Sequence, residues 1–364
     1  MTSRERFLRS MTGGTIDRFF RYEHGPWPST RARWIGEGYP ADANFATHFG
    51  MDPLVRIPVN SGYTDSPYQP KFTETVLEAR DGYRIYVDTD GITRKEFERQ
   101  SDTSMPQFLK FPVATRGDWA EIRRRLDPAD APARIGDVRA LQARCAAADV
   151  PTMLPICGAF GHPRNLFGDE GLAYLIYDDA ALLDEILDNW RDLYAELLRR
   201  LTEAVRVDAI LIWEDMCYKS GPLIAPEHVA RFMIPRYREV IAVARSRGVR
   251  AIIVDTDGDC LKLIPLFLDA GVDCMMPFEV QSGMDVMRIA RQLPSLGIMG
   301  GIDKRVLTQG REAIEREVNR VLPRFLERRR FIPALDHTVP PNVSLGNFEH
   351  YLACVRRHES IGGL

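Results

Sequence analysis

The strongest constraint on the fold is a pattern that recurs five times: a short apolar run that ends at an acidic residue. Residues 252–258 read Ile-Ile-Val-Asp-Thr-Asp-Gly, and four other segments end in the same way, namely 210–215, 275–279, 298–303 and 331–337. Continuous apolar runs of this length are typical of parallel strands buried on both faces. Because the carboxyl ends of parallel strands meet at one edge, the pattern predicts a mostly acidic pocket there.

The rest of the chain after about residue 116 alternates between helical and strand patterns. Apolar residues spaced three and four apart predict a long amphipathic helix over 179–204. Six strands are expected, over 151–157, 207–213, 249–254, 273–277, 296–300 and 330–335. Serial alternation of this kind favours a closed (β/α)8 TIM-type barrel, with a doubly wound open sheet as the alternative. No glycine-rich dinucleotide loop occurs, so we expect no nucleotide cofactor.

The first 115 residues have a different pattern. Residues 16–24 are expected to form the first barrel strand, and 108–113 is a candidate for the eighth. Strand and turn signals dominate 53–100, where 73–79 is expected to pair with 83–88 across Arg80-Asp-Gly82. This segment has no stretch able to bury a core of its own. We therefore predict one domain over 1–364, with an antiparallel insertion at about 53–100.

Composition excludes several classes of protein. The net charge is −3, which gives no reason to expect binding to nucleic acid, and no apolar window is long enough to span a membrane. The six cysteines are scattered without a Cys-x-x-Cys motif, as expected for reduced thiols. The amino terminus has no secretory signal pattern. The expectation is a cytoplasmic protein.

Several motifs resemble the uroporphyrinogen decarboxylase superfamily along almost the whole chain. They are Arg4-Glu-Arg-Phe-Leu8 with Ile16-Asp-Arg18, the segment 213–222 followed by Pro226-Glu-His-Val229, Asp255-Thr-Asp-Gly258, Gly300-Gly-Ile-Asp-Lys304, and 336–341 with Asn347-Phe348. The resemblance implies a barrel whose site lies at the carboxyl edge of the strands. The superfamily includes the haem-pathway decarboxylase and zinc-dependent methyltransferases that act with corrinoid proteins.

The departures from the family pattern narrow the expected activity. The decarboxylase has a Gln-Ala-Gly-Arg-Tyr segment and a basic cup, whereas this chain has Glu23-His-Gly-Pro-Trp27. An acidic pocket would repel a substrate with many carboxylates. The methyltransferases hold zinc with a His-x-Cys pair and a later Cys. Here those positions read Asp255-x-Asp257 and Asp336-His337, so a bound divalent metal (Zn, Mn, Fe or Mg) would have harder ligands.

Strand ends and the resemblance together give the candidate site residues. Catalytic candidates are Glu214, Asp215, Asp257 and His337, and metal-ligand candidates are Asp257, His337 and Glu214. Substrate-binding candidates are His24, His162, Arg164, Tyr218, Lys219 and Asp303. Each also has a structural interpretation: a loop ion pair for Glu214 and Asp215, a helix cap for one of the acids at 255 and 257, and an ordinary polar loop for His162 and Arg164.

The leading functional hypothesis is methyl transfer from a corrinoid protein or another methylated donor to a small-molecule substrate. The second is decarboxylation of a tetrapyrrole or a small carboxylate, which would use anion-binding arginines from the set Arg21, Arg31, Arg33 and Arg164. The third is a barrel that binds a ligand or a corrinoid protein without turnover. Family resemblance also implies a possible homodimer.

Overall fold

The centre of the molecule is a parallel sheet of seven strands. The computed structural model describes residues 1–63, 65–97 and 106–359. Within them the sheet order is β1-β6-β7-β10-β11-β12-β13, and every neighbouring pair is parallel. The strands are β1 (Val55–Arg56), β6 (Thr152–Cys157), β7 (Ala209–Trp213), β10 (Ala251–Thr256), β11 (Cys274–Pro277), β12 (Gly297–Met299) and β13 (Phe331–Ile332).

The strand order bears on the two folds that the sequence left open. The strands follow one another across the sheet in chain order, without the reversal that defines a doubly wound sheet. All six strands expected after residue 150 are present. The architecture is therefore a curled parallel α/β sheet of the TIM-barrel type.

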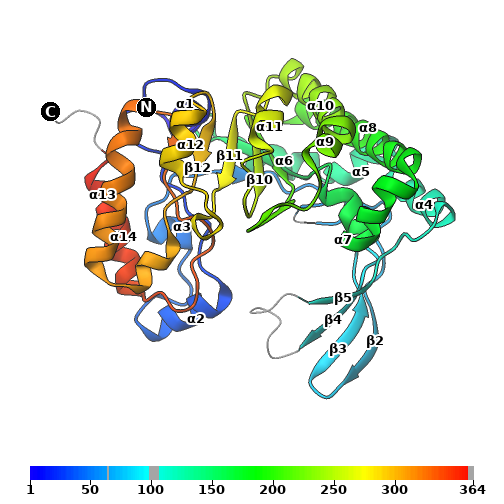
Figure 1. Ribbon diagram of the computed structural model, residues 1–364, viewed down its shortest axis with the longest axis horizontal. Coiled ribbons are helices and arrows are strands. Elements are labelled where there is room, and N and C mark those ends of the chain that lie inside the picture. The colour runs from blue at the N-terminus through cyan, green and yellow to red at the C-terminus, as the bar shows by residue number, and fades with distance from the viewer. Residues whose placement is uncertain (64, 98–105, 360–364) are drawn as a thin grey trace.

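Helices pack around this sheet (Figure 1). They are α1 (Ser3–Thr12), α2 (Pro28–Gly36), α3 (Phe45–His48), α4 (Arg116–Arg123), α5 (Ala131–Ile135), α6 (Val138–Arg144), α7 (Gly161–Asp178), α8 (Ala180–Ala204), α9 (Pro226–His228), α10 (Ile234–Ser246), α11 (Ile264–Ala270), α12 (Val286–Gln292), α13 (Arg311–Arg328) and α14 (Leu345–Arg357). The predicted amphipathic helix is α8; Asp179 caps it by accepting from the backbone N–H of Leu182, and its apolar stripe is buried against α7 and α10.

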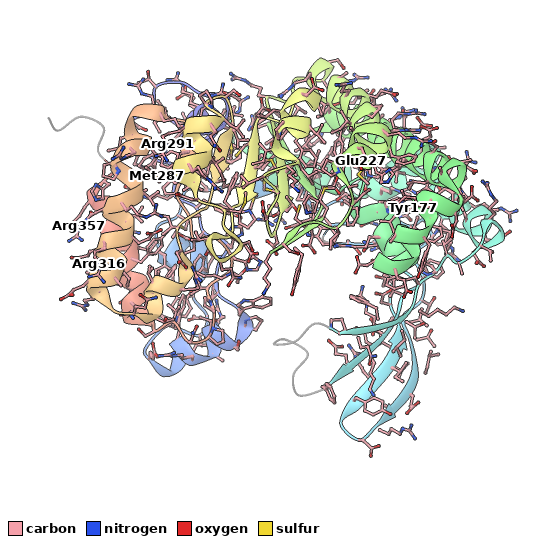
Figure 2. The ribbon with its side chains drawn as sticks, in the orientation of Figure 1. Tyr177, Glu227, Met287, Arg291, Arg316 and Arg357 are labelled. Atoms are coloured by element: carbon pink, nitrogen blue, oxygen red, sulfur yellow. The ribbon has the colours of Figure 1, made fainter. Side chains whose placement is uncertain are left out.

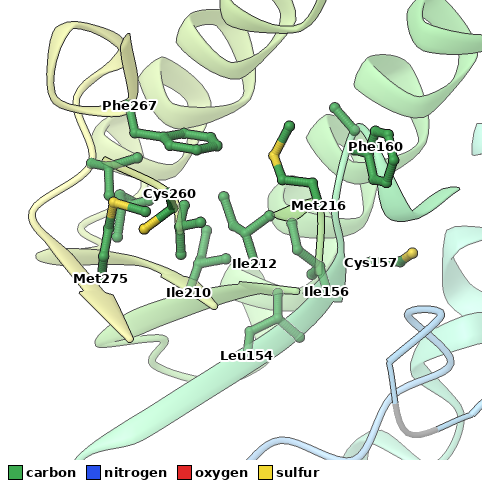
Figure 3. Packing of buried hydrophobic residues seen from close by; sticks show 14 of the residues in the cluster. Leu154, Ile156, Cys157, Phe160, Ile210, Ile212, Met216, Cys260, Phe267 and Met275 are labelled. Atoms are coloured by element: carbon green, nitrogen blue, oxygen red, sulfur yellow. The ribbon is translucent and has the colours of Figure 1, made fainter. Parts of the chain in front are cut away.

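The apolar core has two parts because side chains alternate across each strand. Ile210, Ile212 and Met275 point outward toward the helices, where they meet Phe267 (Figure 3). The residues between them face inward; Leu211 and Ile253 form a second cluster with Phe7 of α1. Helix α1 contacts β10, β12 and β13, so it covers the inner side of the curled sheet. Burial on both faces explains the unbroken apolar runs in the sequence.

Two strand predictions were wrong. Residues 16–24 form no strand. Side-chain carboxylates take the place of the carbonyl groups that would accept hydrogen bonds in a β-sheet. The N–H of Arg21 donates to Oδ2 of Asp52, and the N–H of Leu335 donates to Oε2 of Glu23. The edge strand beside β6 is instead β1, from the segment expected to belong to the insertion. The eighth-strand candidate 108–113 overlaps β5 (Gln107–Lys110), which belongs to a different sheet.

That second sheet is the predicted antiparallel insertion. Its order is β2 (Thr75–Arg80), β3 (Tyr83–Val87), β4 (Thr93–Phe97) and β5, and it projects from the body of the molecule (Figure 1). Strands β2 and β3 pair as expected across Asp81 and Gly82, which both have positive φ, as a two-residue hairpin turn requires. The insertion runs further along the chain than predicted, and residues 98–100 of the predicted range lie outside the described residues.

No helix in the described part of the chain is both long enough and apolar enough to cross a membrane.

Candidate active site

A polar cavity of about 520 Å³ lies at the carboxyl ends of β7, β10 and β11. We call this cavity the mouth. Its lining residues are Asp215, Cys217, Tyr218, Lys219, Asp257, Gly258, Glu279, Gln281 and Ser282. Three of them are acids and one is a lysine, so the acidic pocket expected from the strand ends is present in the geometry.

The pair Asp257 and His337 joins two strand ends at the edge of the mouth. Nε2 of His337 lies 3.4 Å from Oδ2 of Asp257, and the two side chains are 28% and 36% exposed. The hydrogen bond that the His337 ring donates to Asp257 raises the pKa of His337 above its ordinary value, although burial opposes the rise. Solvent therefore reaches an imidazole whose protonation a neighbouring carboxylate controls.

Two aromatic rings hold His337 in place. The His24 ring stacks on it at a centroid distance of 6.2 Å, and Trp27 lies at 6.4 Å. Burial lowers the pKa of His24 to about 3, so this ring is neutral at physiological pH. Its buried Nε2 has no hydrogen-bond partner among the residues that the structure describes. His24 and His337 therefore lie side by side, with the pKa of His24 lowered by burial and the pKa of His337 raised by Asp257.

Asp255 precedes Asp257 by two residues and lies on the inner face of β10, which it shares with Ala251 and Ile253. Burial, followed by the neighbouring charge of Asp257, raises the pKa of Asp255 to about 7. On the adjoining side, Arg56 of β1 donates to the hydroxyl of Tyr22 at 2.9 Å. The sequence pattern drew attention to Asp255 only as part of the Asp255-x-Asp257 pair, and gave no indication of Arg56. Period-two alternation along each strand was the signal that could have placed them.

Glu214 is fully buried and does not line the mouth. Its Oε1 accepts from the backbone N–H of Ala159 at 2.9 Å, and its Oε2 accepts from Phe160 and Gly161 at 2.8 and 3.0 Å. Burial raises the pKa of Glu214 to about 7, and these hydrogen bonds oppose the rise. The carboxylate binds the first turn of α7, where helix N–H groups lack internal partners. This geometry makes Glu214 an anchor for the loop after β6.

Asp215 lines the mouth and pairs with Arg164, which does not line it. Nη1 of Arg164 donates to the carbonyl of Asp215 at 2.7 Å and to its carboxylate at 3.2 Å, while the guanidinium lies over the Trp213 ring. Asp215 has a φ of 46°, a conformation that costs energy for a residue other than glycine. Both residues line a second cavity of about 400 Å³, which extends to Phe108 of the antiparallel sheet.

Four further candidates lie in different environments. Tyr218 and Lys219 line the mouth from an exposed hairpin made by β8 (Cys217–Tyr218) and β9 (Gly221–Pro222). His162 is buried in the first turn of α7, and burial lowers its pKa to about 4. Asp303 accepts from the backbone N–H of Arg305 and pairs with its side chain, which is a capping role. The structure therefore brings Tyr218 and Lys219 to the mouth, but not His162 or Asp303.

The donor set for a metal at the mouth is small. Asp257 and His337 are in contact, whereas Glu214 is engaged by three backbone N–H groups. Catalytic zinc sites use three protein ligands. Among the described residues, one group of three candidate donors has its atoms within 4.8 Å of one another, and it consists of Glu315, His350 and Cys354, outside the mouth. The mouth residues present thus do not complete a zinc site.

Comparison with known proteins decides the family. The family model described as uroporphyrinogen decarboxylase (URO-D) matches residues 96–358. This chain belongs to the uroporphyrinogen decarboxylase family. Curated URO-D relatives include the uroporphyrinogen decarboxylases of Syntrophotalea carbinolica and Geobacter metallireducens. They are 24% and 25% identical to the chain over 260 and 264 residues, and each alignment covers 68% of this chain and 71% of the relative.

Among solved structures, the chain is similar to a methyltransferase from Methanosarcina mazei. The TM-score is 0.58 at 16% identity, and the match covers 98% of this chain and 99% of the other. At that identity the likeness concerns the fold alone. It extends over the amino-terminal segment that the URO-D family model leaves out.

Proposed function

We propose that this URO-D family member is an enzyme that transfers a methyl group from a methylated donor to a small heteroatom nucleophile bound at the mouth. The observation that carries the proposal is the pair of Asp257 and His337, set among acids at the carboxyl edge of the sheet. A corrinoid protein is the proposed donor, as the resemblance to the superfamily implies, and the fold neighbour described as a methyltransferase supports methyl transfer as the reaction class.

The proposed chemistry uses His337 as a base. Because Nε2 of His337 faces the Asp257 carboxylate and carries its proton there, a substrate thiol, hydroxyl or amine would give its proton to Nδ1 of His337, and Asp257 would stabilise the imidazolium that forms. The substrate heteroatom then forms a bond to the methyl carbon, while the donor keeps the electron pair of the bond that breaks. Stacking of neutral His24 against His337 keeps the ring oriented without adding a competing charge.

The distribution of charge favours this reaction over decarboxylation of a tetrapyrrole with many carboxylates. Of the four arginines that such a substrate would use, Arg21 pairs with Glu359, Arg31 donates to backbone carbonyls of the 41–43 loop, and Arg33 pairs with Glu37. Arg164 lines the second cavity, where Asp215 engages it. Three acids face the mouth instead, and they would repel carboxylates.

A divalent metal at Asp257 and His337 would supply Lewis-acid activation of the nucleophile when bound. Because these residues provide two of the donors that zinc requires, the proposed proton transfer is assigned to the side chains themselves. A stoichiometric ion lost in both Asp257→Ala and His337→Ala would support the metal-assisted form of the reaction.

The experiment is a methyl-transfer assay with methylcobalamin and a panel of small thiols, run beside carbon dioxide release from uroporphyrinogen. Loss of about 10²–10⁴-fold in His337→Ala, with the fold intact, is the expected result for a general base. His162→Ala is a matched control, because its ring lies away from the mouth. Carbon dioxide release without methyl transfer would favour the decarboxylase, and ligand binding without either reaction would favour a non-catalytic barrel.

A further inference from the structure

A second cluster of chemically active side chains lies on the pair of helices α13 and α14. Glu315 comes from α13, and His350 and Cys354 come from α14. Each offers one donor atom, and the three atoms lie within 4.8 Å of one another. In Figure 1 this helix pair is at the opposite side of the molecule from α8 and the antiparallel sheet. None of the three residues lines the mouth.

The geometry of the cluster suits a small cation. His350 and Cys354 are four residues apart, so they share one face of α14 and point toward α13. Nε2 of His350 lies 3.2 Å from Oε1 of Glu315. This nitrogen is buried, and none of the described residues meets it with hydrogen-bond geometry. Ligands about 2.1 Å from a tetrahedral zinc ion are ~3.4 Å apart, which is close to this separation.

The chemical identity of the donors points to zinc in particular. The Cys354 thiol is buried, with 1% of the residue exposed, whereas Glu315 reaches solvent. Sulfur, imidazole and carboxylate donors together select a borderline-soft ion such as Zn²⁺ over Mg²⁺ or Ca²⁺. Three protein ligands leave a fourth tetrahedral position for water.

Arg357 now occupies the place of a cation in this cluster. Its Nη2 donates to Sγ of Cys354 at 3.0 Å and lies 3.3 Å from Oε1 of Glu315. The Arg357 side chain is 60% exposed, and Figure 2 shows it at the outer surface of the helix pair. It can therefore turn into solvent without disturbing the core. The guanidinium balances the Glu315 charge.

We propose that Glu315, His350 and Cys354 form a Zn²⁺ site that links α13 to α14, and that Arg357 competes with the ion for it. Binding removes the thiol proton of Cys354 to solvent and displaces the Arg357 guanidinium. Because the three ligands come from two helices, the bound ion stabilises their packing. This site is independent of the chemistry proposed at the mouth.

The test titrates metal-free full-length protein with Zn²⁺, and with Co²⁺ as a spectroscopic probe. We expect one equivalent to bind and the Co²⁺ form to show thiolate-to-metal charge-transfer absorption. Cys354→Ser should abolish that absorption, and His350→Ala should weaken Zn²⁺ binding by at least about tenfold, since even outer-shell changes cost this much. Cys145→Ser, at another buried cysteine, is the matched control and should bind as the wild type does.

Arg357→Gln provides a test that does not depend on a core substitution. Removing the competing cation should tighten Zn²⁺ binding, and the variant should fold normally because the side chain is exposed. His337→Ala should retain the site, which separates it from any ion at the mouth. Wild-type Zn²⁺ affinity in both Cys354→Ser and His350→Ala, or loss of the ion in His337→Ala alone, would overturn the proposal.

Discussion

Nε2 of His337 and Oδ2 of Asp257 lie 3.4 Å apart, although the two residues are separated by 80 positions of the chain. Each follows a strand of the same parallel sheet, so the meeting point is the carboxyl edge that the sequence pattern predicted. Around the pair, His24 and Trp27 contribute ring contacts from a segment that forms no strand. The ring contacts favour one orientation of the proposed base, and Asp257 raises its pKa.

The Asp257→Asn substitution should lower the pKa of His337. Asp257 is the main cause of the rise above the ordinary value of 6.5, whereas burial and Lys304 act in the opposite direction. Histidine titration by NMR should place the wild-type pKa above 6.5 and the variant's pKa below that of the wild type. The exposed His48 supplies an internal reference signal. Identical curves for His337 in the two proteins would show that the pair does not interact in solution.

The Glu214→Gln substitution should destabilise the protein by about 1–3 kcal/mol. Three backbone N–H groups of the loop after β6 depend on this carboxylate, and the amide nitrogen of glutamine cannot accept from them. Urea denaturation measures the loss. The same substitution at the exposed Glu170 of α7 is the control and should stay within about 0.5 kcal/mol of the wild type. Equal effects at the two positions would argue against the anchoring role.

Glu23 should make stability depend on pH. Its carboxyl accepts from Tyr351 O–H and Leu335 N–H, and burial raises its pKa from 4.5 to about 8. The folded protein therefore keeps a proton that the unfolded chain has lost. The contribution of this proton to the free energy of unfolding is fully present below pH 4.5 and is lost as pH rises to about 8. The free energy of unfolding should fall by no more than about 1.4 kcal/mol per pH unit from this cause.

Comparison of wild type with Glu23→Gln isolates this contribution, because the other buried carboxyls are common to both proteins. The stability advantage of the wild type over the variant should shrink between pH 5 and pH 8 in urea denaturation. Glu349→Gln on the exposed face of α14 is the control. A constant difference across this pH range would mean that Glu23 does not hold the proton.

The Phe7→Ala substitution should cost about 3–5 kcal/mol of stability. Phe7 is fully buried inside the curled sheet, and its ring packs edge to face against Phe20 with 5.1 Å between the ring centroids. Thermal or urea unfolding measures the change, and Leu77→Ala at a side chain 59% exposed on the antiparallel sheet is the control. A small effect at Phe7 would mean that α1 does not close the inner face of the sheet.

The part of this structure that could be predicted from sequence is the part in which local pattern and burial agree. Runs such as 252–254 are apolar on both faces, and they became strands; the leucine-rich stripe of 179–204 became α8. Residues 16–24 read as a strand, yet Asp52 and Glu23 supply side-chain acceptors to the neighbouring backbone, an outcome that depends on partners far along the chain.

For the candidate site, too, some positions could be predicted from sequence and others could not. A strand-end position was sufficient to predict that Asp257 and His337 lie close together, because chain direction alone brings strand ends together. It could not distinguish Glu214 from Asp215, since adjacent residues after β7 point in different directions: one toward the first turn of α7 and the other toward the mouth. The positive φ of Asp215 sets this turn, and no sequence motif indicated it.

The most direct test of the proposed function is the pH dependence of kcat/KM for methyl transfer, measured for the wild type and for Asp257→Asn. A base must be neutral to accept a proton, so the wild-type rate should rise with pH through a pKa above 6.5, and the variant's midpoint should move to lower pH. The contradicting result has two parts. The value of kcat/KM would fall as pH rises through the His337 pKa, which would identify His337 as an acid, and the enzyme would release carbon dioxide from uroporphyrinogen.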